Sequence, residues 1–156
     1  MRTLLRTATL LAAFAALPAW AQTNVQNAWI RATVPQQKAT GMFARITSAA
    51  GGRLVAASSP VAGLVEIHEM KMDGNMMRMR AMPALELPAG KTVMLEPGGY
   101  HLMLLELKQP LEPGASVPVT LVVEEAGGKR ANIVVSAPVR PLDAGAPGGA
   151  HGAMKH

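Results

Sequence analysis

The chain has 156 residues, of which 49% are hydrophobic and 16% charged, so it is long enough for one globular domain with tails and too short for two well-packed domains. It contains no cysteine, which excludes disulfides, thiolate zinc sites, iron–sulfur clusters, cysteine nucleophiles and cysteine-ligated blue-copper centres. The formal charge of +5 comes from scattered Lys and Arg, and an aromatic content of 3% leaves few rings for base stacking, so we expect no nucleic-acid partner.

Residues 1–21 have the order of regions typical of a secretory signal peptide. Two arginines precede the apolar run 8–17, and alanines at −3 and −1 mark a cleavage site before Gln22. The apolar run is too short to span a bilayer as a helix, and no cysteine follows it to carry a lipid. We therefore expect a soluble, exported protein without stable membrane insertion.

Short apolar or β-branched runs alternate with turn residues through 22–141, and no window carries a sustained 3.6-residue stripe. Val117, Val119, Leu121 and Val123, for example, alternate at the period of a half-buried strand. We predict strands over 25–34, 40–48, 53–58, 62–72, 76–82, 91–96, 100–108, 117–125 and 130–136. About eight or nine short strands of this kind predict an all-β domain, either a Greek-key barrel or a β-sandwich.

Methionine is concentrated in one predicted hairpin, because six of the eleven methionines lie within residues 70–82. The simplest explanation is that methionine fills irregular gaps in a core. However, Asp73-Gly74 between two strand-like runs predicts a two-residue type I′ turn, in which His68 lies opposite Met79. One face of the hairpin would then carry His68, Met70, Met72, Met77 and Met79, and the other Glu69, Lys71, Arg78 and Arg80. A face that only packed against a core would seldom include a histidine.

A second His/Met pair lies in the predicted strand 100–108. His101 and Met103 are two residues apart, so their side chains leave the same face of the strand, and Gly98-Gly99 just before them allows a tight turn or a close backbone approach. A single histidine on a strand is more often structural than a ligand. Two histidines that are each matched with methionine favour a metal site instead. Imidazole together with thioether favours Cu(I), since thioethers have little affinity for Zn²⁺, Mg²⁺ or Ca²⁺.

The last segment, residues 142–156, consists largely of Gly, Ala and Pro and buries too little to stay ordered. We expect a flexible tail, and it contains His151, Met154 and His156. Exposed imidazoles suit Cu(II) better than Cu(I), which makes the tail a candidate for a second, weaker copper site selective for Cu(II). The alternative is a terminus whose histidines are incidental.

The spacing from His68 through Met79 to His101-Leu102-Met103 resembles the H-x10-M-x21-H-x-M pattern of the PCu(A)C-type periplasmic copper chaperones. Further segments resemble the same family, and the resemblance covers nearly all of 25–137; these segments are 28–33, 57–62, 66–70 and 97–101. The resemblance implies a cupredoxin-like β-barrel in the periplasm that binds one Cu(I) through residues His68, Met79, His101 and Met103.

The family resemblance also implies a partner. It implies delivery of copper toward the Cu(A) centre of cytochrome c oxidase, with oxidase subunit II or another copper chaperone as the recipient. Two other interpretations stay open, namely a periplasmic copper buffer or resistance protein with the same site, and an exported Ig-like structural module whose Met/His cluster only packs. No Ser/His/Asp set, phosphate loop or carboxylate pair stands out in the sequence, so we expect no enzymatic activity.

Overall fold

The computed structural model describes residues 23–144, which form ten strands and no helix. The strands are β1 (Thr23–Arg31), β2 (Ala39–Ser48), β3 (Gly52–Ser58), β4 (Ala62–Asp73), β5 (Met76–Met82), β6 (Leu85–Leu87), β7 (Thr92–Leu95), β8 (Tyr100–Leu107), β9 (Ser116–Glu125) and β10 (Arg130–Arg140). The predicted all-β domain is confirmed. The number of strands was underestimated, because β6 has only three residues and shows no periodicity of its own.

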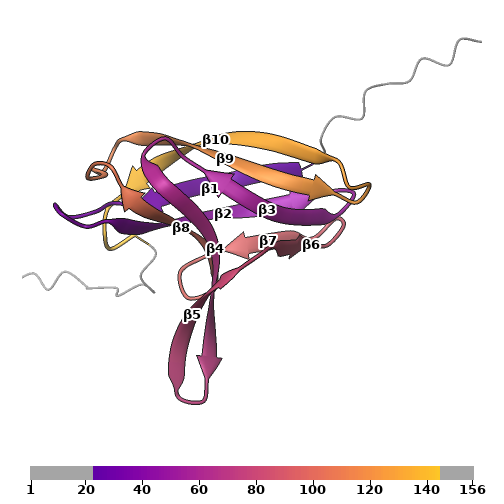
Figure 1. Ribbon diagram of the computed structural model, residues 1–156, viewed down its shortest axis with the longest axis horizontal. Coiled ribbons are helices and arrows are strands. Elements are labelled where there is room, and N and C mark those ends of the chain that lie inside the picture. Colours follow the sequence, from indigo (N-terminus) through magenta and orange to yellow (C-terminus); the bar gives the residue numbers. More distant parts are fainter. Residues whose placement is uncertain (1–22, 145–156) are drawn as a thin grey trace, which may run out of the picture.

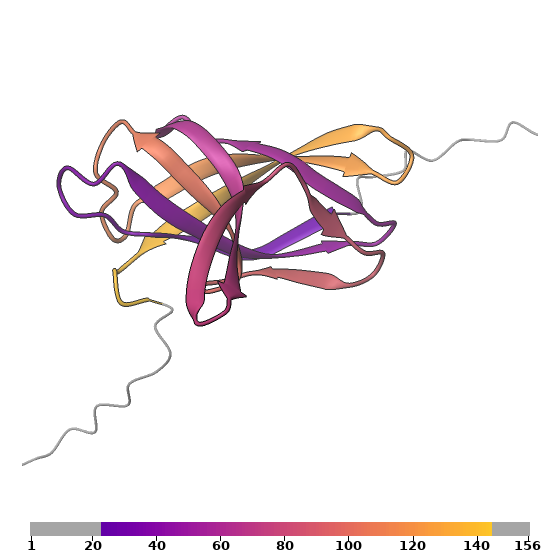
Figure 2. The same cartoon turned by 60° about the horizontal axis from the view of Figure 1, so that its bottom comes forward.

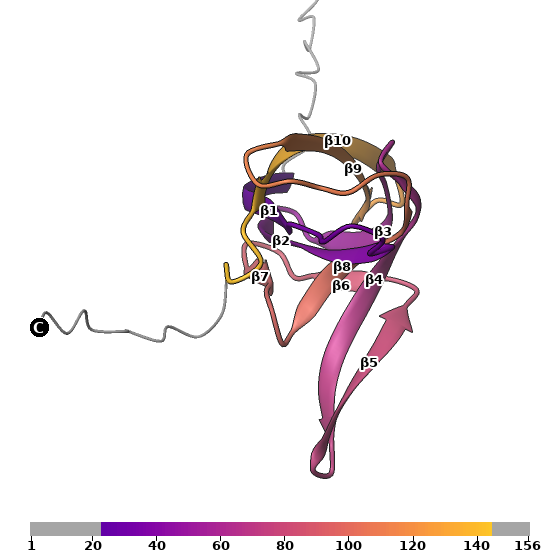
Figure 3. The same ribbon diagram turned by 90° about the vertical axis from the view of Figure 1, so that its left-hand side faces the viewer.

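All ten strands form one sheet in the order β5-β4-β8-β7-β2-β1-β10-β9-β3-β6, with an additional pairing of β8 with β2. The sheet curls around a common core, as the end-on view in Figure 3 shows. The two terminal strands of the domain, β1 and β10, pair in parallel through Ile30 opposite Val139. β10 therefore continues past the predicted end at residue 136, because its last residues complete this pairing and bury Val139.

The core consists of side chains that alternate along the strands. On β9, the predicted inward positions Val117, Val119, Leu121 and Val123 are all buried. They pack in one cluster with apolar residues of β2, β4 and β8, including Ile46, Ile67, Leu102 and Leu104. On β9, period-two alternation therefore identifies the inner face of the barrel.

The β4–β5 hairpin extends well beyond the barrel, as Figures 1 and 3 show, and it comes toward the viewer in Figure 2. Only its base is anchored, where buried Ile67 lies opposite Met82, which packs against the core. Every residue from 71 to 80 is exposed. The methionines of this hairpin tip are therefore not core residues, and gap filling does not explain them.

The register of the hairpin differs from the predicted one. Asp73 pairs with Met76 and Met70 with Met79, so His68 lies opposite Ala81 and not opposite Met79. The two-residue loop is Gly74-Asn75 instead of Asp73-Gly74.

The predicted turn type was also wrong. Among the three residues 73–75 only Gly74 has a positive φ, of 63°, which is the pattern of a type II′ turn with glycine at its first central position, whereas a type I′ turn needs two positive φ values. The shifted register also lets Arg78 form an ion pair with Asp73, at 2.8 Å. Because the shift is by two residues, each side chain keeps its predicted face.

Two predictions lie outside the described residues. These are the signal peptide at 1–21 and the copper-binding tail with His151, Met154 and His156. Within residues 23–144, no helix is long and apolar enough to cross a membrane.

Candidate metal centre

The centre of the candidate site is a pair of histidines on neighbouring strands. The antiparallel register of β4 and β8 places His68 directly opposite His101 and, one step along the same face, Glu66 opposite Met103. The two imidazole rings are 5.7 Å apart between centroids, with their planes at 69°. The four side chains therefore form two adjacent cross-strand pairs on one face of the sheet.

Met79 joins this group from β5. Its Sδ atom lies 3.0 Å from Nδ1 of His68, although His68 pairs with Ala81 in the strand register. Met79 occupies the next same-face position along β5, and a methionine side chain is long and flexible enough to reach back across one step of the ladder. Contact between these two residues was predicted correctly, through a register that was wrong.

Each imidazole is oriented by a hydrogen bond from one ring nitrogen. His68 donates through Nε2 to a carboxylate oxygen of Glu66, at 2.8 Å, which leaves Nδ1 free beside the Met79 sulfur. His101 donates through Nδ1 to the carbonyl oxygen of Gly99, at 3.1 Å, which leaves Nε2 free. A hydrogen bond of this kind fixes the tautomer and the ring orientation of a metal-binding histidine.

His101 is the most enclosed member of the group, with 6% of its surface exposed. Burial lowers the pKa of its imidazole below the ordinary value of 6.5; the hydrogen bond to Gly99 opposes this shift, and the charges of His68 and Arg31 add to it. The imidazole of His101 is therefore neutral at pH 7, which is the form that can bind a metal.

A cavity of about 270 Å³ opens beside these residues. Its walls include His101 and Met103 from β8, Met79 from β5 and Met70 from β4; the other lining residues are Arg31, Gln37, Ala39, Thr40, Gly41, Phe43, Pro97 and Gly98. Three of the four predicted ligands thus line one cavity, and the fourth, His68, contacts Met79 at its edge.

Two residues of β2, Gly41 and Phe43, line the cavity beside Met103. Gly41 pairs with Met103, and a Cβ atom at Gly41 would lie only 2.9 Å from Cζ of Phe43. The Phe43 ring itself is held in place by Trp29, with ring centroids 4.6 Å apart, and by the guanidinium of Arg31, which lies 5.4 Å from its centroid. Space beside Met103 therefore depends on glycine at position 41.

The structure brings His68, Met79, His101 and Met103 together; that they bind a metal remains a prediction. Sequence reasoning missed the residues that orient the histidines, Glu66 and the carbonyl of Gly99. Glu66 is two residues before His68 on a strand, so alternation alone could have assigned it to the same face. Within residues 23–144, no three His, Cys, Asp or Glu side chains gather as a metal site, so any ion held here depends on thioether sulfur.

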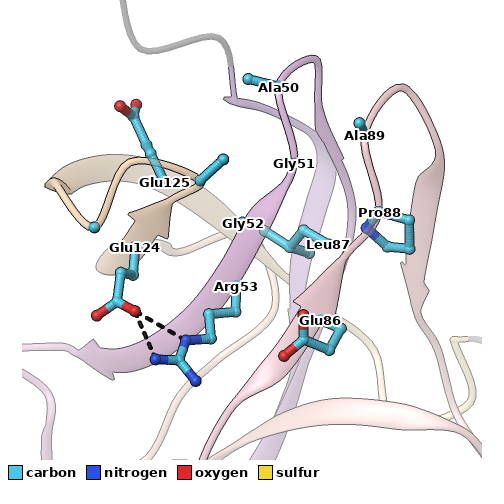
Figure 4. A pocket seen from close by; sticks show the side chains of 12 residues that line it. Ala50, Gly51, Gly52, Arg53, Glu86, Leu87, Pro88, Ala89, Glu124 and Glu125 are labelled. Atoms are coloured by element: carbon cyan, nitrogen blue, oxygen red, sulfur yellow. Dashed lines mark hydrogen bonds and ion pairs between the residues drawn. The ribbon is translucent and has the colours of Figure 1, made fainter.

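A larger hollow, of about 530 Å³, lies elsewhere in the fold and shares no residue with this cavity. As Figure 4 shows, Arg53 donates two hydrogen bonds to Glu124 beside it, at 3.0 and 2.6 Å. These two side chains face each other across paired strands β3 and β9. The charged side chains of this ion pair already satisfy each other, and no histidine or methionine lines the hollow, so the cavity at His101 is the better candidate site.

Comparisons with known proteins identify the family and the fold of the chain. A family model described as "Putative lipoprotein LpqE-like" matches residues 23–139. The chain is 35% identical over 114 residues to "Putative lipoprotein Lxx21020" of Leifsonia xyli subsp. xyli (strain CTCB07), a match that covers 67% of this chain and 69% of that protein.

Solved structures show the same fold. The copper-bound PCuAC domain from PmoF2 superposes with a TM-score of 0.65 at 21% identity, over 77% of this chain and 93% of that one. The solution structure of Cu(I)-bound DR1885 from Deinococcus radiodurans has a TM-score of 0.58 at 30% identity, over 83% of each chain. These likenesses confirm the cupredoxin-like barrel that the sequence resemblance implied.

Proposed function

The chain belongs to the LpqE-like family of PCu(A)C-type domains, and from that premise we propose that it is a copper carrier that binds one Cu(I) through His68, Met79, His101 and Met103. One observation carries the proposal. The ring nitrogen of His68 that is free of its orienting hydrogen bond lies 3.0 Å from the sulfur of Met79. Two oriented imidazoles and two thioethers around one cavity make a soft, neutral ligand set, which favours Cu(I) over Zn²⁺ or Ca²⁺.

The arrangement of the ligands suits transfer of the ion to another protein. His101 is buried at the back of the cavity, whereas 48% of the Met79 surface is exposed and the residue belongs to the projecting hairpin. A ligand from a recipient protein would therefore displace Met79 first, while His101 and Met103 on β8, a strand paired with both β4 and β2, still hold the ion. Release would proceed stepwise, without unfolding of the barrel.

We propose that the protein is exported to the periplasm and delivers copper toward the Cu(A) centre of cytochrome c oxidase, either to subunit II directly or through another chaperone. Absence of cysteine supports this compartment, because exposed thiols would tend to oxidise there. The competing function is that of a copper buffer with the same site and no dedicated recipient. Mixing the Cu(I)-loaded protein with an apo oxidase fragment separates the two, since only a chaperone transfers its ion faster than the same amount of Cu(I) from a small-molecule chelate.

An anaerobic Cu(I) titration of the mature chain against a competing chelator tests the site. We expect one tight equivalent and an X-ray absorption spectrum with mixed nitrogen and sulfur ligation. Replacing His101 by Ala, or Met103 by Leu, should weaken that equivalent, whereas the control Met94→Leu on β7 should not. Binding no tighter than micromolar, or a shell of nitrogen and oxygen only, would overturn the proposal.

We also propose a second, weaker site for Cu(II) in the tail, formed by His151, Met154 and His156. It would raise the local concentration of copper near the main site. Truncation after Pro141 tests it: the Cu(II) stoichiometry should fall by one while the tight Cu(I) equivalent is unchanged. Equal Cu(II) stoichiometry with and without the tail would show that this site does not exist.

A further inference from the structure

The methionines of the hairpin form an ordered array, and the proposed main site includes only one of them, Met79. Met70 pairs with Met79 and, one step closer to the tip, Met72 pairs with Met77. Directly paired residues project to the same side of the sheet, so these four thioethers form two successive cross-strand pairs on one face, which is also the face of His68. The array starts at the hairpin tip and ends at the proposed Cu(I) site.

This array is not explained by packing. Met72 is 56% exposed and Met77 48% exposed, on a hairpin that stands clear of the barrel. Exposing this much apolar surface costs free energy, at about 25 cal/mol per Å² relative to burial. Four unbranched sulfur-containing side chains on a solvent-facing ladder therefore need a functional reason.

The opposite face of the hairpin carries the charges. Arg80 forms an ion pair with Glu69 at 2.7 Å, and Arg78 forms one with Asp73 at 2.8 Å. Lys71 lies opposite Arg78 on that same face. The cationic side chains that would repel a metal ion thus point away from the thioethers, and beyond His68 toward the tip the two ladder pairs of the methionine face present only thioether sulfur.

We propose that Met72 and Met77 form a second, weaker Cu(I) site at the hairpin tip, from which the ion passes through Met70 and Met79 to the main site. This inference rests on the proposed function, because it supplies that site with its entry route. No redox step is involved. The ion enters and leaves as Cu(I), and at each move one copper–thioether bond forms as another breaks.

The spacing of the ladder allows such moves. Same-face neighbours along a strand are about 6.6 Å apart, from a rise of about 3.3 Å per residue. A methionine side chain has three rotatable bonds, so thioethers of adjacent pairs can reach a common ion between them. Met79 is the shared member, since its sulfur already touches Nδ1 of His68.

The test is a residue-by-residue titration of the full mature chain with labelled methionine methyl groups, followed by NMR. Ag(I) serves as a stable soft probe, and Cu(I) is then added anaerobically. We expect the first equivalent to shift the methyl signals of Met79 and Met103, and the second to shift those of Met72 and Met77. In Met72→Leu/Met77→Leu, which keeps the apolar surface and removes both sulfurs, the second set of shifts should be lost and the first kept. Met94→Leu, an exposed methionine on β7, is the matched control.

The loading rate gives an independent readout. Transfer of Cu(I) from a weak chelate into the main site should slow in the double Leu variant, with the affinity of that site unchanged. Failure of Met72 and Met77 to respond to Ag(I) or Cu(I), or an unchanged loading rate in the double variant, would overturn the relay. If Met79 and Met103 also fail to respond, it is the proposed function that fails. A weaker interaction with a protein partner, at equal metal loading, would mean that the array is a docking surface instead.

Discussion

His68 and His101 lie directly opposite each other on β4 and β8, with their rings 5.7 Å apart and close to perpendicular. Neither ring is free to rotate away, because one is hydrogen-bonded to Glu66 and the other to the carbonyl of Gly99. The free nitrogen of each imidazole is therefore defined before any ion arrives. Such preorganisation reduces the cost of ordering the ligands on binding.

Removing the Glu66 carboxylate should weaken Cu(I) binding without changing its stoichiometry. In Glu66→Ala, His68 loses the acceptor that fixes its orientation, and partners of this type are worth about 10- to 100-fold in metal affinity. Chelator competition measures the change. Glu66→Gln, whose amide oxygen can still accept the hydrogen bond, should recover part of the affinity. Glu86→Ala, at the exposed middle position of β6, is the control, and an equal loss in that variant would contradict the role of Glu66.

Replacing Gly74 by Val should weaken Cu(I) binding although position 74 touches no ligand. Gly74 has a φ of 63°, and a non-glycine residue in this region costs about 1–2 kcal/mol. A Cβ atom there meets nothing within 4 Å, so the effect acts through the backbone of the turn and hence through the register that presents Met79 to His68. Gly128→Val, with a φ of 81° and equally open surroundings, imposes the same strain on the β9–β10 turn and should leave copper affinity unchanged.

The composition of the site was predictable from the sequence to the extent that it depends on strand periodicity. Alternation assigns His101 and Met103 to one face, and Met70, Met72, Met77 and Met79 to another common face, whichever of the two hairpin registers forms. The turn itself was ambiguous, because Asp-Gly and Gly-Asn are both good two-residue loops. The assignment of each side chain to a face of the hairpin was still correct, because the two registers differ by two residues.

Long-range pairing was not predictable. Three strands lie between His68 and His101 in the sequence. No local pattern indicates that β4 and β8 become neighbours with these two residues directly opposite each other. The same limit applies to the position of the Phe43 ring beside Gly41, because that position depends on how Trp29 of β1 packs against Phe43 of β2. Only the family spacing pointed to one site.

The stability of the metal-free protein should fall as the pH drops through the range below 6.5. Burial lowers the pKa of His101 in the folded state, and the facing groups His68 on β4 and Arg31 on β1 lower it further. Between the ordinary value of 6.5 and the lower folded value, the unfolded chain binds a proton that the folded chain does not, so acidification favours unfolding. Denaturant unfolding at pH 7.5 and 5.5 measures this difference. It should be smaller in His101→Asn, and an undiminished pH dependence in that variant would contradict the assignment.

Replacing Gly41 by Ala should lower thermal stability and weaken Cu(I) binding at the proposed site. The Cβ atom of Gly41→Ala would lie 2.9 Å from Cζ of Phe43, a residue that is 4% exposed and whose ring packs at a tilt against Trp29, so the ring has little room to move. Overpacking of this kind typically costs about 1–3 kcal/mol. Because Gly41 pairs with Met103, the strain falls beside a proposed ligand, and we expect lower thermal stability together with weaker Cu(I) binding. Gly127→Ala, where a Cβ atom meets nothing within 4 Å, is the matched control for both measurements. If Gly41→Ala lost stability but bound Cu(I) as tightly as the unmodified chain, the packing of Phe43 beside Gly41 would not determine how Met103 is presented to the ion.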